Sequence, residues 1–474
     1  MTGWPNHHKS IARRKPPPTV HHSGMLSSRR VWTLAACLLA VAPACAGADA
    51  TGQLAHYLAV PDASYTWREV RSSRLGATDV TELVLTSQTW RDIRWKHQLV
   101  IIRPKSLERA STQAFLFIHG GRWKPEYETG QAQLPREARI FARLAETLRA
   151  PVAVLRHVPF QPLFDRREDA LIAYTFDHYL ETGEPDWPLL LPMVKSAARA
   201  MDAVQAFARE RWQHPVHAFT VAGASKRGWT SWLTAAVDPR VASVAPIAID
   251  MLNVPAQIEL QRATFGALSE QVQDYVNIDL PGRVNTERGQ SLMAMVDPYR
   301  YRADLDQPKL ILLGTNDQYW PLDALKVYWD ELPEPKRVLY VPNQGHGIRD
   351  LDRLIGGLSA LHRYSSHGER LPVMSWTYAV RTGRLDVDVQ SNRVPRRVRA
   401  WTATSPTRDF RTARWTSHSC RRTDEAYACS VARAPEGYTA VYAELWFKDS
   451  GYPKFPLATV VCIAGGPDGE PMVC

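Results

Sequence analysis

Residues 219–230 constrain this chain more than any other segment. They read Phe-Thr-Val-Ala-Gly-Ala-Ser-Lys-Arg-Gly-Trp-Thr, an apolar β-type run that passes through small residues into a helix-compatible stretch. Ser225 stands at the apex, where a sharp strand-to-helix turn exposes a nucleophilic hydroxyl. Glycine usually lies two residues after such a serine, whereas Arg227 holds that position here and Gly228 follows. The alternative is a glycine-rich turn with an incidental serine.

Strands and helices alternate on both sides of this turn, which predicts a mostly parallel, doubly wound sheet. The predicted fold class is therefore α/β, specifically an α/β-hydrolase fold with helical cap insertions near 166–195 and 251–300. The expected strands are 81–86, 97–102, 114–118, 151–155, 241–250, 310–314 and 337–342.

The composition changes near Gly368, after a predicted helix over about 350–364. Residues 371–474 contain short alternating runs and turn residues, which predict a small β-sandwich-like domain after an α/β domain over 49–370. The expected strands there are 373–380, 385–389, 398–403, 439–447 and 458–463. Arginine is dense between Arg381 and Arg422, which indicates either a solvated basic face or a surface for an anionic partner.

Residues 1–48 have the pattern of a secretory leader, and the true start is a choice between Met1 and Met25. Arginines precede an apolar run over 31–44 that is too short to span a bilayer, and two A-x-A cleavage sites follow. The prediction is export to the periplasm or the medium. A lipobox-like segment ending at Cys37 leaves lipoprotein anchoring as a lesser alternative, and the paired arginines weakly resemble a twin-arginine signal.

The leader also accounts for much of the net charge of +10. It carries six Lys/Arg and no acid, so its removal leaves about +4, and no nucleic-acid partner is expected.

Four cysteines lie in the last sixty residues, and an even number in an exported chain suggests disulfides. Three pairings are open, and the local pairs Cys420–Cys429 and Cys462–Cys474 are favoured. Cys-x-x-Cys spacing is absent, and neither a metal site nor a cofactor is predicted.

A base and an orienting acid follow Ser225 in the chain order of an α/β hydrolase. Asp317 follows the strand that ends at 314, and His346 follows the strand that ends near 341. Because ligands bind beyond the carboxyl ends of parallel strands, the three residues are expected to meet. Asp323 and Asp250 are alternatives for the acid.

The segment His119-Gly120-Gly121 follows another predicted strand, where such folds supply one oxyanion-binding N–H. Gly120 and Gly121 are thus candidates for the oxyanion hole, together with the backbone of Lys226. His119 itself is expected to be structural, with substrate binding as the lesser alternative.

Further substrate-binding candidates are Arg227, Trp229 and Trp320. Lys226 and Arg227 could bind an anionic substrate group, although a structural ion pair is the favoured role for Arg227.

These segments resemble the PhoPQ-activated pathogenicity-related protein family, exported α/β-hydrolase-like proteins with relatives among the autocrine proliferation repressor proteins. The resemblance covers essentially residues 50–465, and its most specific part is the turn Gly-Ala-Ser-Lys-Arg-Gly-Trp at 223–229. The family shares the arginine two residues after the serine. The other matching segments are 57–67, 86–91 with 95–97, 187–201 and 314–317. The resemblance implies the fold, export and a Ser-Asp-His site, but no substrate.

The sequence therefore predicts an exported serine hydrolase that cleaves a peptide or ester bond of a small-molecule or peptide substrate. The alternative is a non-catalytic envelope protein that uses the hydrolase fold as a scaffold and binds anionic surfaces through its basic β-domain.

Overall fold

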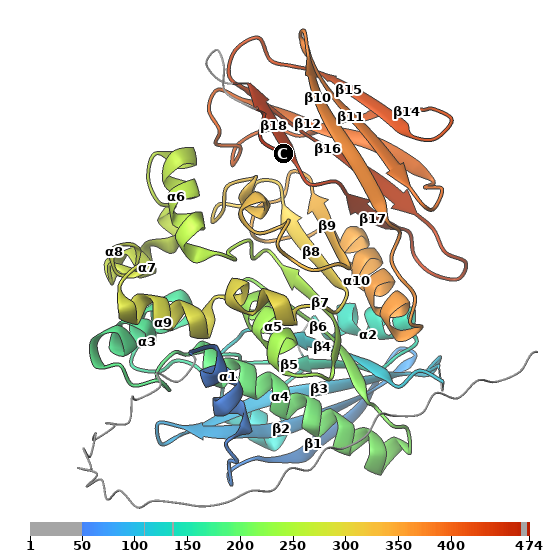
Figure 1. Ribbon diagram of the computed structural model, residues 1–474. Helices are drawn as coiled ribbons and strands as arrows, with labels where there is room; N and C mark the ends of the chain where they lie inside the picture. Colours follow the sequence, from blue (N-terminus) through green and yellow to red (C-terminus); the bar gives the residue numbers. More distant parts are fainter. Residues whose placement is uncertain (1–49, 109, 135–136, 466–471) are drawn as a thin grey trace, which may run out of the picture. The chain divides into compact units, whose positions relative to one another are not determined.

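The computed structural model describes residues 50–108, 110–134, 137–465 and 472–474 (Figure 1). The leader predicted over 1–48, with Met25 and Cys37, lies outside these residues. Within the described residues, no helix combines the length and apolar character needed to cross a membrane.

A 14-stranded sheet is built in the order β1-β2-β3-β5-β4-β6-β7-β8-β9-β17-β16-β12-β13, with β18 paired to β16. Strands β4 to β9 pair in parallel, in the order β5-β4-β6-β7-β8-β9. Strands β1, β2 and β3 form an antiparallel meander, and β3 pairs antiparallel with β5. β5 lies between β3 and β4, so β4 and β5 are exchanged relative to their order in the chain. This strand order, followed by parallel strands, is that of an α/β-hydrolase fold. The strands up to β9 are β1 (Thr66–Leu75), β2 (Thr78–Trp90), β3 (Ile93–Pro104), β4 (Gln113–Ile118), β5 (Val152–Leu155), β6 (Ala218–Ala224), β7 (Val241–Ile247), β8 (Lys309–Gly314) and β9 (Lys336–Val341).

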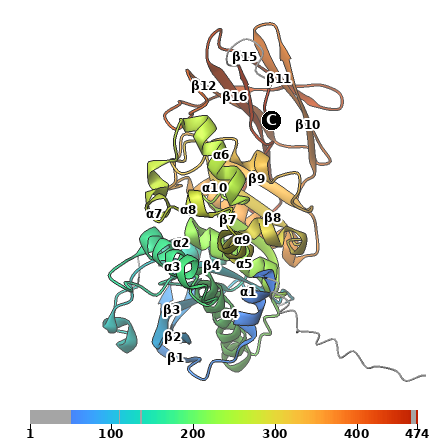
Figure 2. The same cartoon turned by 60° about the vertical axis from the view of Figure 1, so that its left-hand side comes forward.

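The parallel strands read as apolar runs because helices cover both faces of the sheet. One core cluster packs the sheet against α4 and α5, and the other packs it against α2 and α10 (Figures 1 and 2). The helices of the α/β part outside the 251–300 insertion are α1 (Ala50–Ala59), α2 (Ala138–Leu148), α3 (Glu168–Thr182), α4 (Leu190–Phe207), α5 (Lys226–Val237) and α10 (Leu351–Ser366).

The insertion between β7 and β8 is helical, as the sequence predicts, and contains no strand among its described residues. Together with α3 it covers the end of the sheet at which Ser225 lies. Its helices are α6 (Val254–Phe265), η3 (Glu270–Val272), α7 (Gln273–Asn277), α8 (Leu280–Arg283), α9 (Glu287–Val296) and η4 (Pro298–Asp304).

The C-terminal strands form two antiparallel layers, in agreement with the predicted β-sandwich-like architecture. One layer continues the large sheet, because Ala458 on β17 pairs with Val338 on β9. The other layer has the order β10-β11-β15-β14, and alternate apolar side chains of the two layers share one core. The strands are β10 (Met374–Arg381), β11 (Arg384–Ser391), β12 (Arg397–Ser405), β13 (Thr416–Ser419), β14 (Arg421–Arg422), β15 (Tyr427–Ala432), β16 (Tyr438–Phe447), β17 (Phe455–Ala458) and β18 (Cys462–Gly465).

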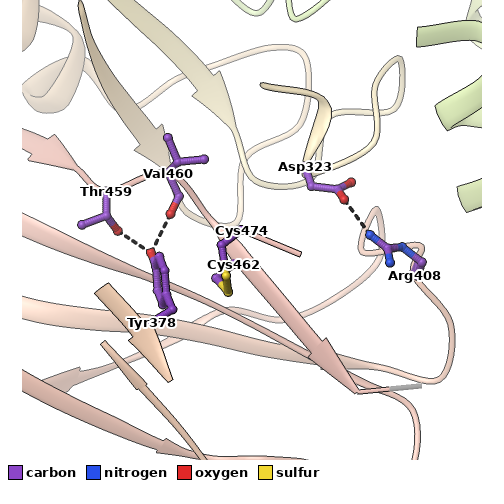
Figure 3. Close-up of a disulfide and its surroundings, with 7 residues drawn as sticks. All are labelled: Asp323, Tyr378, Arg408, Thr459, Val460, Cys462 and Cys474. Carbon is purple, nitrogen blue, oxygen red and sulfur yellow. Dashed lines mark hydrogen bonds and ion pairs between the residues drawn. A yellow bond between two sulfur atoms is a disulfide. The ribbon is translucent and has the colours of Figure 1, made fainter. Parts of the chain in front are cut away.

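The single strand expected over 458–463 is wrong, because residues 459–461 separate β17 from β18. The break has partners of its own: Tyr378 Oη donates to the carbonyl oxygen of Val460 at 2.6 Å and lies 2.7 Å from Thr459 Oγ1 (Figure 3). An apolar run alone does not reveal such a break, since its polar partner comes from a distant strand.

Both favoured disulfides are present, Cys420–Cys429 and Cys462–Cys474 (Figure 3 shows the second). The first ties β15 to the residue before β14, and the second holds the C-terminal Cys474 against β18.

Candidate active site

The turn at Ser225 joins β6 to α5 with strained backbone angles. Ser225 has φ 58° and ψ −131°, a conformation that a non-glycine residue adopts only when its surroundings enforce it. Its N–H donates to Ile247 O on the neighbouring strand at 2.8 Å, and its carbonyl oxygen accepts from Trp229 N at 3.0 Å. These bonds present the side chain at the first turn of α5.

The glycine spacing of this turn has a steric cause. A Cβ at Gly223 would lie 2.5 Å from the carbonyl oxygen of Arg227, and one at Gly228 would lie 2.6 Å from Ile249 Cγ2. Strand and helix therefore approach too closely for side chains at these two positions. Residue 227 is not under this restriction, which explains how the chain accommodates an arginine where glycine is usual.

Asp317 and His346 meet Ser225 beyond the ends of β8 and β9. His346 Nε2 lies 2.8 Å from Ser225 Oγ, and His346 Nδ1 lies 2.9 Å from Asp317 Oδ2. The Asp317 carboxylate accepts a hydrogen bond from the Nδ1–H of His346, so Nε2 carries no proton and can accept from the serine hydroxyl. The geometry is that of a nucleophile, a base and an orienting acid.

Neighbouring residues hold this arrangement in place. Asp317 Oδ1 accepts from Tyr319 N at 2.9 Å, and the Tyr319 ring stacks on His346 with a centroid separation of 4.1 Å. The Gln318 side chain accepts from His346 N at 3.3 Å. Gly345 leaves room for this side chain, since a Cβ would lie 2.6 Å from Gln318 Nε2.

The two alternative acids have other partners. Asp250 accepts from Tyr328 Oη at 2.5 Å, and burial raises its pKa to about 8, with the charges of Asp317 and Asp323 adding to that rise. Asp323 pairs with Lys326 at 2.6 Å and with Arg408 at 2.7 Å (Figure 3). Of the three candidate acids, Asp317 is the one that contacts His346.

A pocket opens at Ser225, and five of the predicted site residues line it: Ser225, Lys226, Trp229, Trp320 and His346. Helices α3 and α6 to α9 supply most of the remaining wall. The two segments predicted as caps thus both reach the site.

Gly120, Gly121, His119 and Arg227 do not line this pocket. Gly120 is packed under Arg227, where a Cβ would lie 2.6 Å from the guanidinium carbon, and Gly121 is packed against the His157 ring. His119 Nδ1 donates to Gly120 O at 2.9 Å, and burial lowers the pKa of its ring. These contacts fit the structural role expected for His119.

The buried side chain of Arg227 forms an ion pair with Glu168 and does not line the pocket. Its Nη1 and Nη2 donate to the two carboxylate oxygens of Glu168 at 2.8 and 2.7 Å, and its Nε donates to Val158 O at 2.6 Å. The favoured structural role of Arg227 therefore matches its contacts, whereas binding of an anionic substrate group by Arg227 does not.

Lys226 joins the same network from inside the pocket. Its Nζ lies 3.0 Å from Glu168 Oε2 and 2.9 Å from Asp169 Oδ2. Burial alone would raise the pKa of Glu168, but the hydrogen bonds and charge of Arg227, with the charge of Lys226, lower it to about 2. The network links the turn at Ser225 to the first turn of α3.

Sequence reasoning missed Glu168, Asp169 and Tyr319. The two acids open a predicted helical segment and complement the charges of Lys226 and Arg227, but pairing across nearly sixty residues leaves no local pattern. Tyr319 stands two residues after Asp317, and its adjacency to the candidate acid was the available signal.

The dense arginines of the C-terminal part are largely paired with acids, hydroxyls or an aromatic ring. The arginine partners are Arg381–Asp386, Arg384–Ser430, Arg393–Asp449, Arg397–Trp446, Arg399–Ser417, Arg408–Asp323 and Arg411–Asp409.

No group of three or more side chains suited to a metal ion occurs in the described ranges.

Comparison with solved structures finds acetyl xylan esterases. Acetyl xylan esterase 1 from Thermoanaerobacterium sp. JW/SL YS485 is 15% identical, with a TM-score of 0.44, over 66% of this chain and 94% of that one. The acetyl xylan esterase from Paenibacillus sp. R4 is 13% identical, with a TM-score of 0.45, over 67% of this chain and 92% of that one.

Comparison at the sequence level identifies a family. Autocrine proliferation repressor protein A of Dictyostelium discoideum is 30% identical over 384 residues, which are 75% of this chain and 75% of that protein. Residues 54–411 match the family described as PhoPQ-activated pathogenicity-related protein, which confirms the resemblance drawn from the sequence. The chain belongs to the PhoPQ-activated pathogenicity-related protein family.

Proposed function

We propose that this protein is an exported serine hydrolase that cleaves an acyl bond through Ser225, His346 and Asp317. The observation that carries the proposal is the continuous hydrogen-bonded chain from Ser225 Oγ through His346 to Asp317, with contacts of 2.8 and 2.9 Å. Residues from three separate loops converge on it, and it opens into a pocket.

The proposed reaction has two halves. Ser225 Oγ attacks the substrate carbonyl carbon while His346 Nε2 takes its proton, and the same proton then goes to the leaving group. Water next attacks the carbonyl carbon of the acyl group and gives a proton to His346, which passes it to Ser225 Oγ as the acyl–Oγ bond breaks and the acid is released. Asp317 holds the Nδ1–H of His346 and stabilises the imidazolium that forms in each half.

The proposed oxyanion hole uses the first N–H groups of α5. Lys226 N lies at a helix N-terminus, where N–H groups have no partner within the helix and the dipole favours negative charge. The Gly120–Gly121 loop follows β4, the strand next to β6, but neither glycine lines the pocket, so the donor that we assign is the N–H of Lys226.

Labelling with a fluorophosphonate tests the proposal. The mature wild-type protein should be labelled, and Ser225→Ala should not. Ser231→Ala is the matched control, because Ser231 is a buried serine on the same helix that donates to Arg227 O at 2.8 Å and lies outside the pocket lining. A wild-type protein that resists labelling would refute the assembled triad.

Export rests on the leader pattern of residues 1–48 and is supported by the two disulfides. Sequencing the N-terminus of the protein secreted by its host should find Gly47 or Asp49, the residues after the two A-x-A sites. An uncut N-terminus in the cytoplasm would contradict export.

The non-catalytic alternative has less support. It needs an unpaired basic surface, yet four of the eleven arginines from Arg381 to Arg422 pair with acids within the described chain. Salt-sensitive binding of the full mature chain to anionic vesicles, unchanged in Ser225→Ala, would favour it.

A further inference from the structure

The pocket at Ser225 has mostly apolar walls. Side chains from the insertion supply the largest part of this surface, including Ile258, Leu268, Val272, Val276, Leu280 and Met293. Phe176 of α3 and Trp229 of α5 complete it near Ser225. Such a surface favours a substrate group without charge.

The charged residues that line the pocket are engaged with one another. Asp169 Oδ2 contacts Lys226 Nζ at 2.9 Å, and Asp169 Oδ1 accepts from Tyr275 Oη at 3.0 Å. Lys226 Nζ is further held by Glu168 at 3.0 Å. These side chains satisfy each other's charge, so they place no unpaired charge on the wall.

The two carboxamides of α6 are also turned to the protein. Gln257 Nε2 donates to Leu252 O and Ala324 O, both at 3.2 Å, and Gln261 Oε1 accepts from Ser269 N at 2.9 Å. The remaining oxygen of Gln257 is buried without a partner in the described chain and carries no charge. Polar residues thus contribute mainly structural contacts here.

We propose that this pocket holds an apolar acyl group larger than acetyl, so that the substrate is an ester or amide of an apolar carboxylic acid. The inference rests on the proposed function. When the alcohol or amine leaves with the proton from His346, the acyl group stays bonded to Ser225 Oγ until water replaces it. An apolar pocket beside Ser225 Oγ therefore stabilises the acyl group, which stays bonded to that oxygen, more than the leaving group. The position of the leaving group must instead admit the attacking water.

A series of p-nitrophenyl esters with acyl chains from acetyl to decanoyl tests the proposal on the full mature protein. Each buried methylene is worth about fourfold in binding, so the two additional methylenes should raise kcat/KM about fifteenfold from acetyl to butyryl. In a second series, acetyl esters of alcohols of increasing length, kcat/KM should change less than threefold, because the alcohol does not enter the apolar pocket.

Val276→Asp places a charge on the pocket wall and should reduce the butyryl-to-acetyl ratio of kcat/KM at least tenfold, because an unpaired charge disfavours an apolar neighbour. Asn277→Asp is the matched control, since Asn277 is exposed on the same short helix and does not line the pocket. Its ratio should equal that of the wild type.

The outcomes separate this inference from the proposed function. A protein that is labelled at Ser225 but prefers acetyl esters, or responds to the alcohol series instead, overturns the acyl pocket and leaves the serine hydrolase standing. An equal fall of the butyryl-to-acetyl ratio of kcat/KM in the control Asn277→Asp would also overturn the acyl pocket. A protein that neither reacts with the probe nor turns over any ester refutes both.

Discussion

Replacing Arg227 by methionine should destabilise the protein, because its buried guanidinium makes three hydrogen bonds, two of them with the partly exposed Glu168. The substitution keeps the apolar stem but removes the donors to Glu168 and Val158 O. Arg227 is 10% exposed in its side chain, so water cannot replace these bonds freely. Glu168 retains Lys226 at 3.0 Å and Gln161 at 2.6 Å.

The size of the effect follows from these contacts. Removing one partner of a fully buried ion pair costs about 3–5 kcal/mol. The Glu168 side chain is 41% exposed and keeps two partners, so the expected loss is smaller, about 2–3 kcal/mol. The same loss should slow fluorophosphonate labelling, because Arg227 also packs on Gly120 and belongs to the first turn after Ser225.

The loss should depend on pH. Burial alone would raise the pKa of Glu168, but pairing with Arg227 and Lys226 lowers this pKa from 4.5 to about 2. A lowered pKa stabilises the folded state above the unfolded pKa, and this contribution disappears as the pH falls through the folded pKa. The difference between wild type and Arg227→Met should therefore be largest above pH 4.5 and shrink toward pH 2.

Urea unfolding followed by tryptophan fluorescence measures this difference. Arg74→Met is the control, because Arg74 and Asp79 form an exposed pair, 65% and 52% exposed, whose loss should cost under about 0.5 kcal/mol. A loss in Arg227→Met no larger than in the control, or one that does not change with pH, would refute the reasoning.

Three further predictions concern single residues. Gly228→Ala should lower the free energy of unfolding by about 1–3 kcal/mol in urea titrations, since its Cβ would meet Ile249 Cγ2 at 2.6 Å; an unchanged midpoint would contradict this. Asp317→Asn should reduce kcat on a butyrate ester about 10⁴-fold by favouring the wrong tautomer of His346, with an unfolding midpoint close to wild type; a reduction under tenfold would count against the triad. Burial raises the pKa of Asp250 from 3.8 to about 8, so wild-type stability should fall as the pH rises through that interval; Asp250→Asn should lack this fall in unfolding at pH 4, 6, 8 and 9, and parallel curves would contradict it.

The fold was accessible from the sequence because its information is local. Apolar runs such as 114–118 and 310–314 mark buried parallel strands wherever helices cover both faces of a sheet. The turn at 223–229 could be located because its small residues are needed within the turn itself, where β6 and α5 nearly touch.

Other features were beyond the sequence because they depend on contacts between distant segments. Residues 459–461 interrupt an apolar run to meet Tyr378, and the sequence left Asp250 and Asp323 as alternatives to Asp317, the predicted partner of His346. Only folding separates Asp317, which contacts that ring, from Asp250 and Asp323, which have other partners.

By itself the sequence determined where the buried parallel strands lie along the chain, the turn that exposes Ser225 and the order of serine, acid and histidine along the chain. The tertiary structure decided how these residues meet and what surrounds them: Glu168 binds Arg227 across the turn, and the insertion supplies an apolar wall. The physical reason is that backbone geometry and burial leave periodic patterns in neighbouring residues, whereas ion pairs and pocket walls join side chains that no local spacing relates.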